Sequence, residues 1–379
     1  MKIAIGIMSG TSLDGVDVVV VKIKGTFTDS QIEVIDFKTF PINREMKARI
    51  KAQFLPATSD IKSLTSLNFE ISQLYAKYVK TILRANNIEA NDVSFVASHG
   101  QTIYHIPVKT TTEVASTLQL GDGSVLANIL KINTISNFRT ADIALGGQGA
   151  PLVPYADFCL FKSDKTNRIM LNIGGISNIT YLKKGAKLDD VIAFDTGPGN
   201  MIINYFVEKL YQIPYDNQGL IARSGKIVEP LLKELLADSY LQQLPPKTTG
   251  RERYGDFYAE QLLNKYQNCP KEDLVATVTH FTAEAIKTGC KLVASDLTDF
   301  ELIASGGGAH NLYLLEIIQK LMPELKVLTT ADFKMDVDAK EAIAFTILGN
   351  ETLRGKPSNV KSATGAREPV ILGQISFVK

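Results

Sequence analysis

The sequence contains no tryptophan, and it has few of the residue types that bind metals or form disulfides. Its three cysteines, Cys159, Cys269 and Cys290, lie far apart and form no CxxC pair, so their spacing indicates neither a disulfide framework nor a zinc site. The four histidines include no HExxH pair, which is the spacing of a zinc protease. We therefore expect no structural transition metal.

The sequence also lacks an excess of charge and long apolar runs. Its 41 basic residues balance 40 acidic ones to a net charge of +1, whereas a nucleic-acid-binding protein needs a strong basic patch. Nowhere do 18 apolar residues follow one another without a charge, and the chain opens on a strand pattern without an apolar leader. We predict a cytoplasmic protein that binds neither nucleic acid nor membranes.

The length of the chain indicates more than one domain. At 379 residues, of which 45% are hydrophobic, the chain is too long for one ordinary core. Residues 137–151 are rich in glycine and mixed in charge, as a connection between domains often is. We predict two lobes, one formed by residues 1–135 plus 355–379 and the other by residues 136–354.

The first 24 residues read as a strand, a polar turn and a second strand. Alternating isoleucines at positions 3, 5 and 7 precede the turn of residues 9–15, and a β-branched run follows at residues 16–23. Gly10 and Gly15 allow backbone angles at which successive amides converge on an anion, and Thr11 and Ser12 add hydroxyl donors. The turn therefore suits a phosphate, although an ordinary hairpin with a polar tip is an open alternative.

This turn resembles a P-loop only in its glycine spacing. Gly10 and Gly15 are followed by Val16 and Asp17 rather than by Lys and Ser or Thr, and a strand follows where a P-loop has a helix. The turn offers carboxylates instead. Asp14 and Asp17 are candidate ligands for a magnesium ion beside phosphate oxygens.

The opening pattern returns halfway along the chain. Residues 169–173 form a predicted strand, residues 174–178 a Gly/Ser/Asn turn and residues 179–182 a second strand. A third strand is predicted at residues 31–40 and a long amphipathic helix at residues 60–84. Two strand-turn-strand units, each at the start of a domain-sized half, predict a duplicated fold.

Three further strand ends carry polar residues. The predicted strand 93–97 leads into a polar loop at residues 98–102, in which His99 and Gln101 are candidates for bonding a sugar hydroxyl, although a lone histidine is more often structural. The predicted strand 191–194 ends at Asp195, before a glycine-rich loop, which is a catalytic position. Helix capping is an alternative role for Asp195, but Asn200 is better placed for it. The predicted strand 300–304 leads through three glycines into a helix, a junction that suits a nucleotide.

Together these features predict an α/β protein of the actin-like, sugar-kinase-like ATPase fold. In this fold two similar lobes with mixed sheets close around an ATP cleft. A doubly wound dinucleotide-binding fold would need GxGxxG between a strand and a helix, and the first lobe has none.

Seven segments in order along nearly the whole chain closely resemble the anhydro-N-acetylmuramic acid kinase family. They are GIMSGTSLDGVD (residues 6–17), SHGQT (98–102), FRTADIALGGQGAPLVP (138–154), NIGGISNIT (172–180), FDTGPGN (194–200), SGGGAHN (305–311) and KEAIAF (340–345). One departure is Gly123, in a Gly-Asp-Gly segment where the family usually has Gly-Asp-Pro. We expect a more mobile segment there, with substrate affinity the property at risk.

The resemblance implies an unusual double reaction. Such kinases hydrolyse the 1,6-anhydro bridge of the cell-wall sugar and transfer the γ-phosphate of ATP to O6, which gives N-acetylmuramic acid 6-phosphate and ADP for peptidoglycan recycling. They use magnesium and are usually homodimers. By resemblance and chain position we assign the catalytic base to Asp195, because a carboxylate can take a proton from water at neutral pH.

The remaining residue assignments fall into two groups. The sugar-binding candidates are His99, Gln101, Thr102, Arg139, Asp142 and Glu341. The ATP-binding candidates are Gly10, Thr11, Ser12, Leu13, Asp14, Gly15, Val16, Asp17, Gly174, Gly175, Asn178, Gly306, Gly307, Gly308 and Asn311.

Three other functions compete with this one. Another sugar or acyl kinase of the same fold would share the ATP features but would put no oxygen from water on the anomeric carbon. A non-catalytic ATP-binding sensor would bind nucleotide without converting a sugar. A glycoside hydrolase would need a second acid near Asp195 and no ATP.

Overall fold

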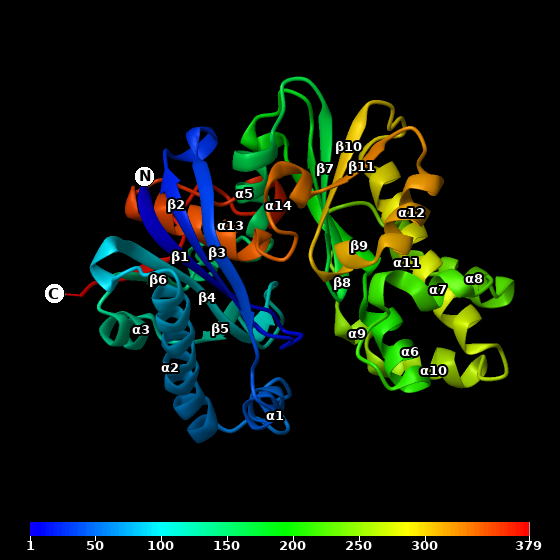
Figure 1. Ribbon diagram of the computed structural model, residues 1–379, viewed down its shortest axis with the longest axis horizontal. Helices are drawn as coiled ribbons and strands as arrows, with labels where there is room; N and C mark the ends of the chain where they lie inside the picture. Colours follow the sequence, from blue (N-terminus) through cyan, green and yellow to red (C-terminus); the bar gives the residue numbers. More distant parts are fainter. Residues whose placement is uncertain (379) are drawn as a thin grey trace. The chain divides into compact units, whose positions relative to one another are not determined.

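The computed structural model describes residues 1–378 and divides into two compact units (Figure 1). Unit 1 comprises Met1–Leu160 with the segment from Ala339 onward, and unit 2 comprises Phe161–Asp338. The units therefore divide elsewhere than the predicted lobes, since residues 136–160 and 339–354 group with unit 1. The reason is packing: helix α13 (Lys340–Leu353) lies against strands β1, β2 and β4 of unit 1.

Unit 1 contains a seven-stranded mixed sheet. Its strands are β1 (Lys2–Ser9), β2 (Val16–Lys24), β3 (Gln31–Phe40), β4 (Val93–Ile106), β5 (Ser116–Leu120), β6 (Thr134–Ser136) and β12 (Gln374–Ser376). The order is β12-β6-β4-β1-β2-β3, with β5 paired to β4. β1, β2 and β3 are antiparallel neighbours, whereas β1, β4 and β6 run parallel.

Unit 2 repeats this arrangement in five strands. They are β7 (Asn167–Ile173), β8 (Ile176–Leu182), β9 (Ile192–Pro198), β10 (Phe300–Ser305) and β11 (Lys326–Thr329). The order β11-β10-β7-β8-β9 has an antiparallel β7-β8-β9 meander and parallel β7, β10 and β11. It matches β6-β4-β1-β2-β3 of unit 1 strand for strand. The predicted duplication and the actin-like, sugar-kinase-like fold class are confirmed.

The alternation of β1 explains how both faces of the first sheet are covered. Ile5 and Ile7 are fully buried in the same core cluster as Leu67 and Ile71 of helix α2 (Ile61–Ala85). Full burial of such side chains contributes about 1.5–3 kcal/mol each. The intervening Gly6 faces α13, and a Cβ atom there would lie 2.0 Å from the carbonyl oxygen of Ala342. The small residue thus allows a helix to pack directly on the strand.

Long helices cover the second sheet as well. Buried residues of α11 (Lys271–Val293) and α12 (Leu312–Leu321) share a core with β7, β9 and β10. A further apolar cluster joins α11 to the shorter helices of unit 2. The other α-helices are α1 (Arg44–Ala52), α3 (Gly123–Leu130), α4 (Thr140–Ala144), α5 (Val153–Phe161), α6 (Met201–Tyr211), α7 (Leu220–Ser224), α8 (Glu229–Leu236), α9 (Arg251–Tyr254), α10 (Asp256–Lys265) and α14 (Lys361–Thr364).

Two predicted strand ends are wrong. β4 does not give way to a loop at residues 98–102 but continues to Ile106, because β5 pairs with it and because Ser98, His99 and Gln101 are buried. β9 likewise continues past Asp195 to Pro198, paired with β8. Asp195 therefore lies within a strand rather than at its end.

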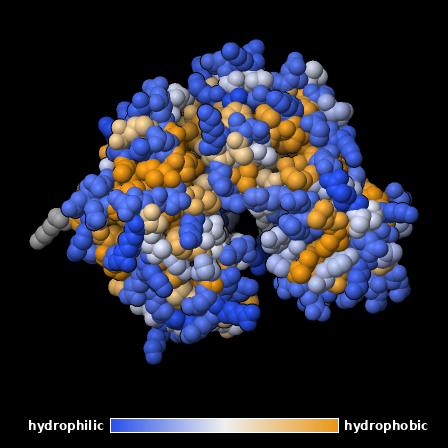
Figure 2. Space-filling model, viewed as in Figure 1, coloured by the Kyte–Doolittle hydropathy of each residue, from blue (hydrophilic) through white to orange (hydrophobic). Residues whose placement is uncertain are grey.

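Polar residues cover most of the face that Figure 2 shows, with hydrophobic residues gathered in separate patches. None of the helices within residues 1–378 combines the length and apolar character needed to cross a membrane.

Candidate active site

The turn between β1 and β2 presents polar groups to solvent, and a buried side chain holds it in place. Thr11, Ser12 and Asp14 are exposed, whereas the side chain of Leu13 is fully buried and its φ is +60°. The amide of Leu13 donates to the carbonyl oxygen of Gly10 over 3.2 Å. The buried leucine thus fixes a turn whose hydroxyls point outward, as a phosphate-binding turn requires.

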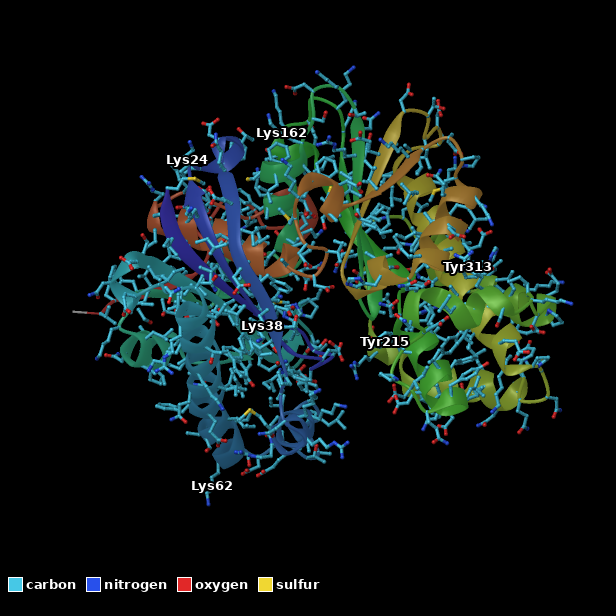
Figure 3. All side chains as sticks on the ribbon, in the orientation of Figure 1. Lys24, Lys38, Lys62, Lys162, Tyr215 and Tyr313 are labelled. Atoms are coloured by element: carbon cyan, nitrogen blue, oxygen red, sulfur yellow. The ribbon has the colours of Figure 1, made fainter. Side chains whose placement is uncertain are left out.

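This turn lies at the end of the sheet opposite Lys24, the last residue of β2 (Figure 3). The side chain of Val16 is also buried, so Leu13 and Val16 offer a ligand only their backbone groups. Gly15 fits closely against β3, since a Cβ there would lie 2.5 Å from the Cγ2 atom of Thr39.

The two predicted metal ligands differ in their surroundings. Asp14 is exposed, and the Oδ1 atom of Asp17 accepts a 2.6 Å hydrogen bond from the hydroxyl of Thr39. Within the described chain, no three histidine, cysteine or acidic side chains are grouped closely enough to hold a metal. One or two carboxylates nevertheless fit magnesium, because it usually keeps several waters and takes its other ligands from substrate phosphates.

The ends of the parallel strands β1 and β4 are joined by buried polar side chains. The hydroxyl of Ser9 donates to Oε1 of Gln101 over 2.8 Å, and Nε2 of Gln101 donates to the carbonyl oxygens of Gly10 and Thr102. Gln101 is 1% exposed. It therefore links the phosphate-type turn to β4, and its amide is largely used by the protein itself.

His99 and Arg139 form a second linked pair in unit 1. Nε and Nη2 of Arg139 donate to Nε2 of His99 over 3.2 and 2.7 Å, while Nη1 donates to the carbonyl oxygen of Gly149. Burial and then the nearby Arg139 charge lower the pKa of His99 to about 3. Burial also lowers the pKa of Arg139 to about 10. A neutral imidazole and a guanidinium are therefore the forms present at neutral pH.

Glu341 lies in the first turn of α13, close enough to Arg139 for their charges to interact. Burial is the main cause that raises the pKa of Glu341, while the charges of Lys340 and Arg139 lower it and Asp157 raises it. Lys340 and Asp157 themselves form a buried ion pair with 3.1 Å between Nζ and Oδ1. Unit 1 thus brings together His99, Arg139 and Glu341.

Asp142 has a different environment from these residues. Its fully buried carboxylate accepts hydrogen bonds from the Gly149 amide at 2.8 Å, Nδ2 of Asn359 at 3.0 Å and the Thr364 hydroxyl at 2.8 Å. Both oxygens are used internally. Asp142 therefore ties the glycine-rich segment after α4 to the C-terminal segment of unit 1.

Two remaining predictions in unit 1 concern Thr102 and Gly123. The hydroxyl of Thr102, on β4, accepts a 3.3 Å bond from Nε2 of Gln119 on β5. Gly123, where the sequence departs from the family, is buried in the first turn of α3. The carboxylate of Asp122 caps that helix through the amides of Ser124 and Val125.

In unit 2, Asp195 is held through its main chain and through one of its two carboxylate oxygens. Its Oδ2 atom accepts from the hydroxyl of Thr248 at 2.7 Å and from the amide of Thr249 at 2.9 Å. Its carbonyl oxygen accepts from the hydroxyl of Tyr240 at 2.8 Å, and its amide donates to the carbonyl oxygen of Lys247 at 3.3 Å. Both bonds to the carboxylate meet Oδ2, so neither donor occupies Oδ1.

The electrostatic surroundings of Asp195 suit a base. Burial raises the pKa of Asp195 above its ordinary value, and the two threonine hydrogen bonds and the charge of Lys247 act against this rise. The charge of Glu252 raises it further. Glu252 is thus a second acid close to Asp195. A glycoside hydrolase, one of the competing functions, would need such an acid. A carboxylate with a raised pKa is a stronger proton acceptor than an ordinary one.

Glycine-rich segments of unit 2 pack closely on one another. A Cβ at Gly308 would lie 2.2 Å from Cγ2 of Ile173, at the end of β7, and one at Gly306 would lie 2.6 Å from Oδ1 of Asn172. The amide of Asn200 donates to the carbonyl oxygen of Gly174. The structure therefore groups Gly174 and Gly175 with Gly306, Gly307 and Gly308.

The two asparagines predicted to bind ATP lie at a helix N-terminus and on a strand. Oδ1 of Asn311 caps α12 by accepting from the amide of Leu314 at 3.0 Å. Asn178, on β8, is the register partner of Asp195 on β9. Asn200 precedes α6, as the sequence suggested, but its Nδ2 donates to the carbonyl oxygen of Ile173 and its side chain makes no cap.

The segment that holds Asp195 was not found from the sequence. Lys247, Thr248 and Thr249 are some fifty positions further along the chain (separations of 53 and 54 for the two threonines). The Pro-Pro-Lys-Thr-Thr-Gly sequence reads as a loop, and nothing in its pattern specifies a carboxylate partner.

Comparison with known proteins gives a match over nearly the whole chain. The family model described as anhydro-N-acetylmuramic acid kinase matches residues 2–378. The chain belongs to this family. The anhydro-N-acetylmuramic acid kinase of Clostridioides difficile (strain 630) is 46% identical to it over 374 residues, which cover 98% of each protein. That of Francisella tularensis subsp. novicida (strain U112) is 45% identical, with 99% of each protein covered.

A kinase is an ATP-dependent phosphotransferase, so membership of the anhydro-N-acetylmuramic acid kinase family makes the chain an enzyme of that class. Among solved structures, the activator of the 2-hydroxyisocaproyl-CoA dehydratase from Clostridium difficile with bound ADPNP has a TM-score of 0.47 and 11% identity, and the match covers 91% of this chain and 93% of that one. A likeness this distant supports no conclusion about this chain.

Proposed function

We propose that the chain converts 1,6-anhydro-N-acetylmuramic acid, water and ATP into N-acetylmuramic acid 6-phosphate and ADP, for the recycling of cell-wall fragments. The observation that carries this proposal is the family match over residues 2–378. The half-buried Asp195, with one carboxylate oxygen bonded and a raised pKa, adds a base of the kind that this reaction needs.

In the first half of the proposed reaction Asp195 takes a proton from water. The water oxygen forms a bond to the anomeric carbon, and the bond between that carbon and O6 breaks. The electron pair of the broken bond stays on O6, which becomes negatively charged. Because O6 already carries this pair, no separate base is needed to activate it.

In the second half O6 attacks the γ-phosphorus of ATP. A bond forms between O6 and phosphorus, the bond from phosphorus to the β,γ-bridging oxygen breaks, and ADP leaves with that electron pair. The proton on Asp195 returns to solvent. Phosphoryl transfer of this kind depends mainly on positioning and charge neutralisation.

We assign the phosphates to the turn at residues 10–15, whose exposed Thr11 and Ser12 hydroxyls and backbone amides are suitable donors. Magnesium, when bound, would neutralise phosphate charge, and Asp14 and Asp17 are the carboxylates that we propose for it. The glycine segments at residues 174–175 and 306–308, with Asn178 and Asn311, are assigned to the rest of the nucleotide.

We assign the sugar to Arg139, His99, Gln101, Thr102 and Glu341. The Arg139 guanidinium suits the lactyl carboxylate of the substrate, because arginine matches the geometry of carboxylates. Asp142 is better supported as an indirect contributor, since its carboxylate is fully used by the protein. A homodimer in the cytoplasm, where ATP is supplied, completes the proposal.

The test is to incubate the protein with ATP, magnesium and 1,6-anhydro-N-acetylmuramic acid in oxygen-18 water and to read the product by mass spectrometry. The expected product is a sugar phosphate that carries the heavy oxygen on its anomeric carbon. An Asp195→Asn preparation is the control, and it should yield neither phosphate nor label.

Other results would select the alternatives. A phosphorylated sugar without label indicates a kinase that acts on an ordinary hydroxyl. A labelled sugar that forms without ATP indicates a hydrolase, for which Glu252 would be the second acid. Release of ADP without any sugar product leaves an ATPase or a nucleotide-binding sensor.

A further inference from the structure

The loop at residues 245–250 is built onto the strand that carries Asp195. The carbonyl oxygen of Lys247 accepts from the Asp195 amide, and the next two residues donate to the carboxylate. Three consecutive residues of the loop therefore contact one residue of β9. Closing the loop does not require both side-chain and main-chain donors on one atom, yet the Thr248 hydroxyl and the Thr249 amide both donate to Oδ2 of Asp195.

Lys247 fixes the loop from the inside. Its side chain is 9% exposed, and Nζ donates to the carbonyl oxygens of Tyr240 and Leu241 at 3.0 and 3.1 Å. The same ammonium lies 4.6 Å from the ring centroid of Tyr240 and 5.5 Å from that of Phe194. Phe194 precedes Asp195 in β9, and the hydroxyl of Tyr240 donates to the carbonyl oxygen of Asp195. Lys247 therefore connects the loop to two residues that hold Asp195 in place.

We infer that Thr248 is a positioning residue for Asp195: its hydroxyl, with the Thr249 amide, fixes Oδ2 and leaves Oδ1 as the oxygen that receives the proton from water. Thr248 itself is exposed, so its side chain is not needed to fill a core. The inference rests on the proposed role of Asp195 as the base.

The charges around Asp195 predict the effect of removing the Thr248 hydroxyl. Burial and the charge of Glu252 raise the pKa of Asp195, whereas the bonds from Thr249 and Thr248 and the charge of Lys247 lower it. Tyr240, whose own pKa burial raises, supplies a neutral hydroxyl there. Loss of the hydroxyl removes one of the three groups that keep Asp195 ionised. The pKa of Asp195 then rises, and the acid limb of the pH profile moves to higher pH.

The variants to compare are Thr248→Val, which keeps the shape and loses the hydroxyl, and Thr248→Ser, which keeps the hydroxyl. A hydrogen bond to a charged group contributes about 1.5–3 kcal/mol, so we expect kcat of Thr248→Val to fall about ten- to hundredfold. The acid limb of kcat/KM should move to higher pH. Thr248→Ser should restore both the rate and the position of that limb.

Thr298 provides a matched control. Its amide donates to Oδ1 of Asp296 at 2.9 Å, and its side chain also bonds that exposed carboxylate. Thr298→Val therefore removes the same kind of bond elsewhere in unit 2 and should leave the rate and pH profile unchanged. Thermal unfolding of each variant shows whether it is folded, and Thr248→Ala gives a second hydroxyl deletion if valine is not tolerated.

Three results decide the question. A shifted acid limb in Thr248→Val that serine restores supports the inference. An unshifted limb in folded Thr248→Val and Thr248→Ala, while Asp195→Asn is inactive, overturns the inference alone. Full activity of Asp195→Asn overturns the base assignment, and the positioning role of Thr248 with it.

Discussion

Replacement of Asp195 by asparagine separates the chemical role of this residue from its structural role. The side chains have nearly the same shape, and an amide oxygen in the position of Oδ2 can still accept from the Thr248 hydroxyl and the Thr249 amide. The main-chain bonds to Tyr240 and Lys247 do not involve the side chain. The fold around β9 should therefore survive the change.

The cost in rate follows from the proton that water must lose. A positioned general base contributes about 10²–10⁴-fold, which corresponds to about 3–5 kcal/mol of activation free energy. An amide cannot accept this proton. We expect kcat for sugar phosphorylation to fall by at least this factor, because Asp195 is the only base proposed for the ring-opening step.

The free energy of unfolding of Asp195→Asn should change in the opposite direction to its rate. The pKa of Asp195 is raised in the folded protein, so ionisation of this carboxyl opposes folding at neutral pH. The wild type should gain stability relative to Asp195→Asn as the pH falls through the folded pKa. At neutral pH the variant should be as stable as the wild type or more so.

The assay measures sugar phosphate by mass spectrometry, nucleotide affinity by calorimetry with a non-hydrolysable ATP analogue, and the free energy of unfolding in urea at neutral and mildly acidic pH. Asp296→Asn is the control, since it alters an exposed carboxylate with a similar threonine partner. Phosphorylation by Asp195→Asn at the wild-type rate would refute the base assignment. Loss of nucleotide binding or folding would assign a structural role instead.

Two further changes test buried groups of unit 1. Asp142→Ala removes the acceptor of three buried hydrogen bonds, so urea denaturation should show a loss of about 3–5 kcal/mol. Unchanged stability with weaker sugar binding would make Asp142 a direct ligand. Lys340→Met leaves Asp157 buried and unpaired, which should cost about 3–5 kcal/mol. Adding Asp157→Leu should restore most of that stability in the same experiment, and a double variant less stable than Lys340→Met would contradict this account.

Local patterns were sufficient for much of the fold. The isoleucine alternation of β1 and the β-branched run of β2 specify a hairpin, and the same pattern at β7 and β8 specifies its duplicate. Helix α2 follows from apolar residues at helical spacing. Such periodicity is a property of neighbouring residues, so it can be read without knowledge of the tertiary structure.

The polar stretch at the end of β4 could not be predicted in this way. Ser98, His99 and Gln101 have the composition of a loop, yet they are buried in a strand. Gln101 bonds Ser9 and Nε2 of His99 bonds Arg139, partners that are distant in the sequence. Burial of a polar residue depends on those partners, and no local pattern shows them.

The sequence by itself determined the family, the repeated strand-turn-strand unit and the residue types available for chemistry. The tertiary structure decided how those residues are used: Asp142 is held by three internal donors, and Asp195 is held by a threonine 53 positions away. The physical reason is that hydrogen bonding and desolvation set the reactivity of a side chain. Both depend on groups that only the folded chain brings together.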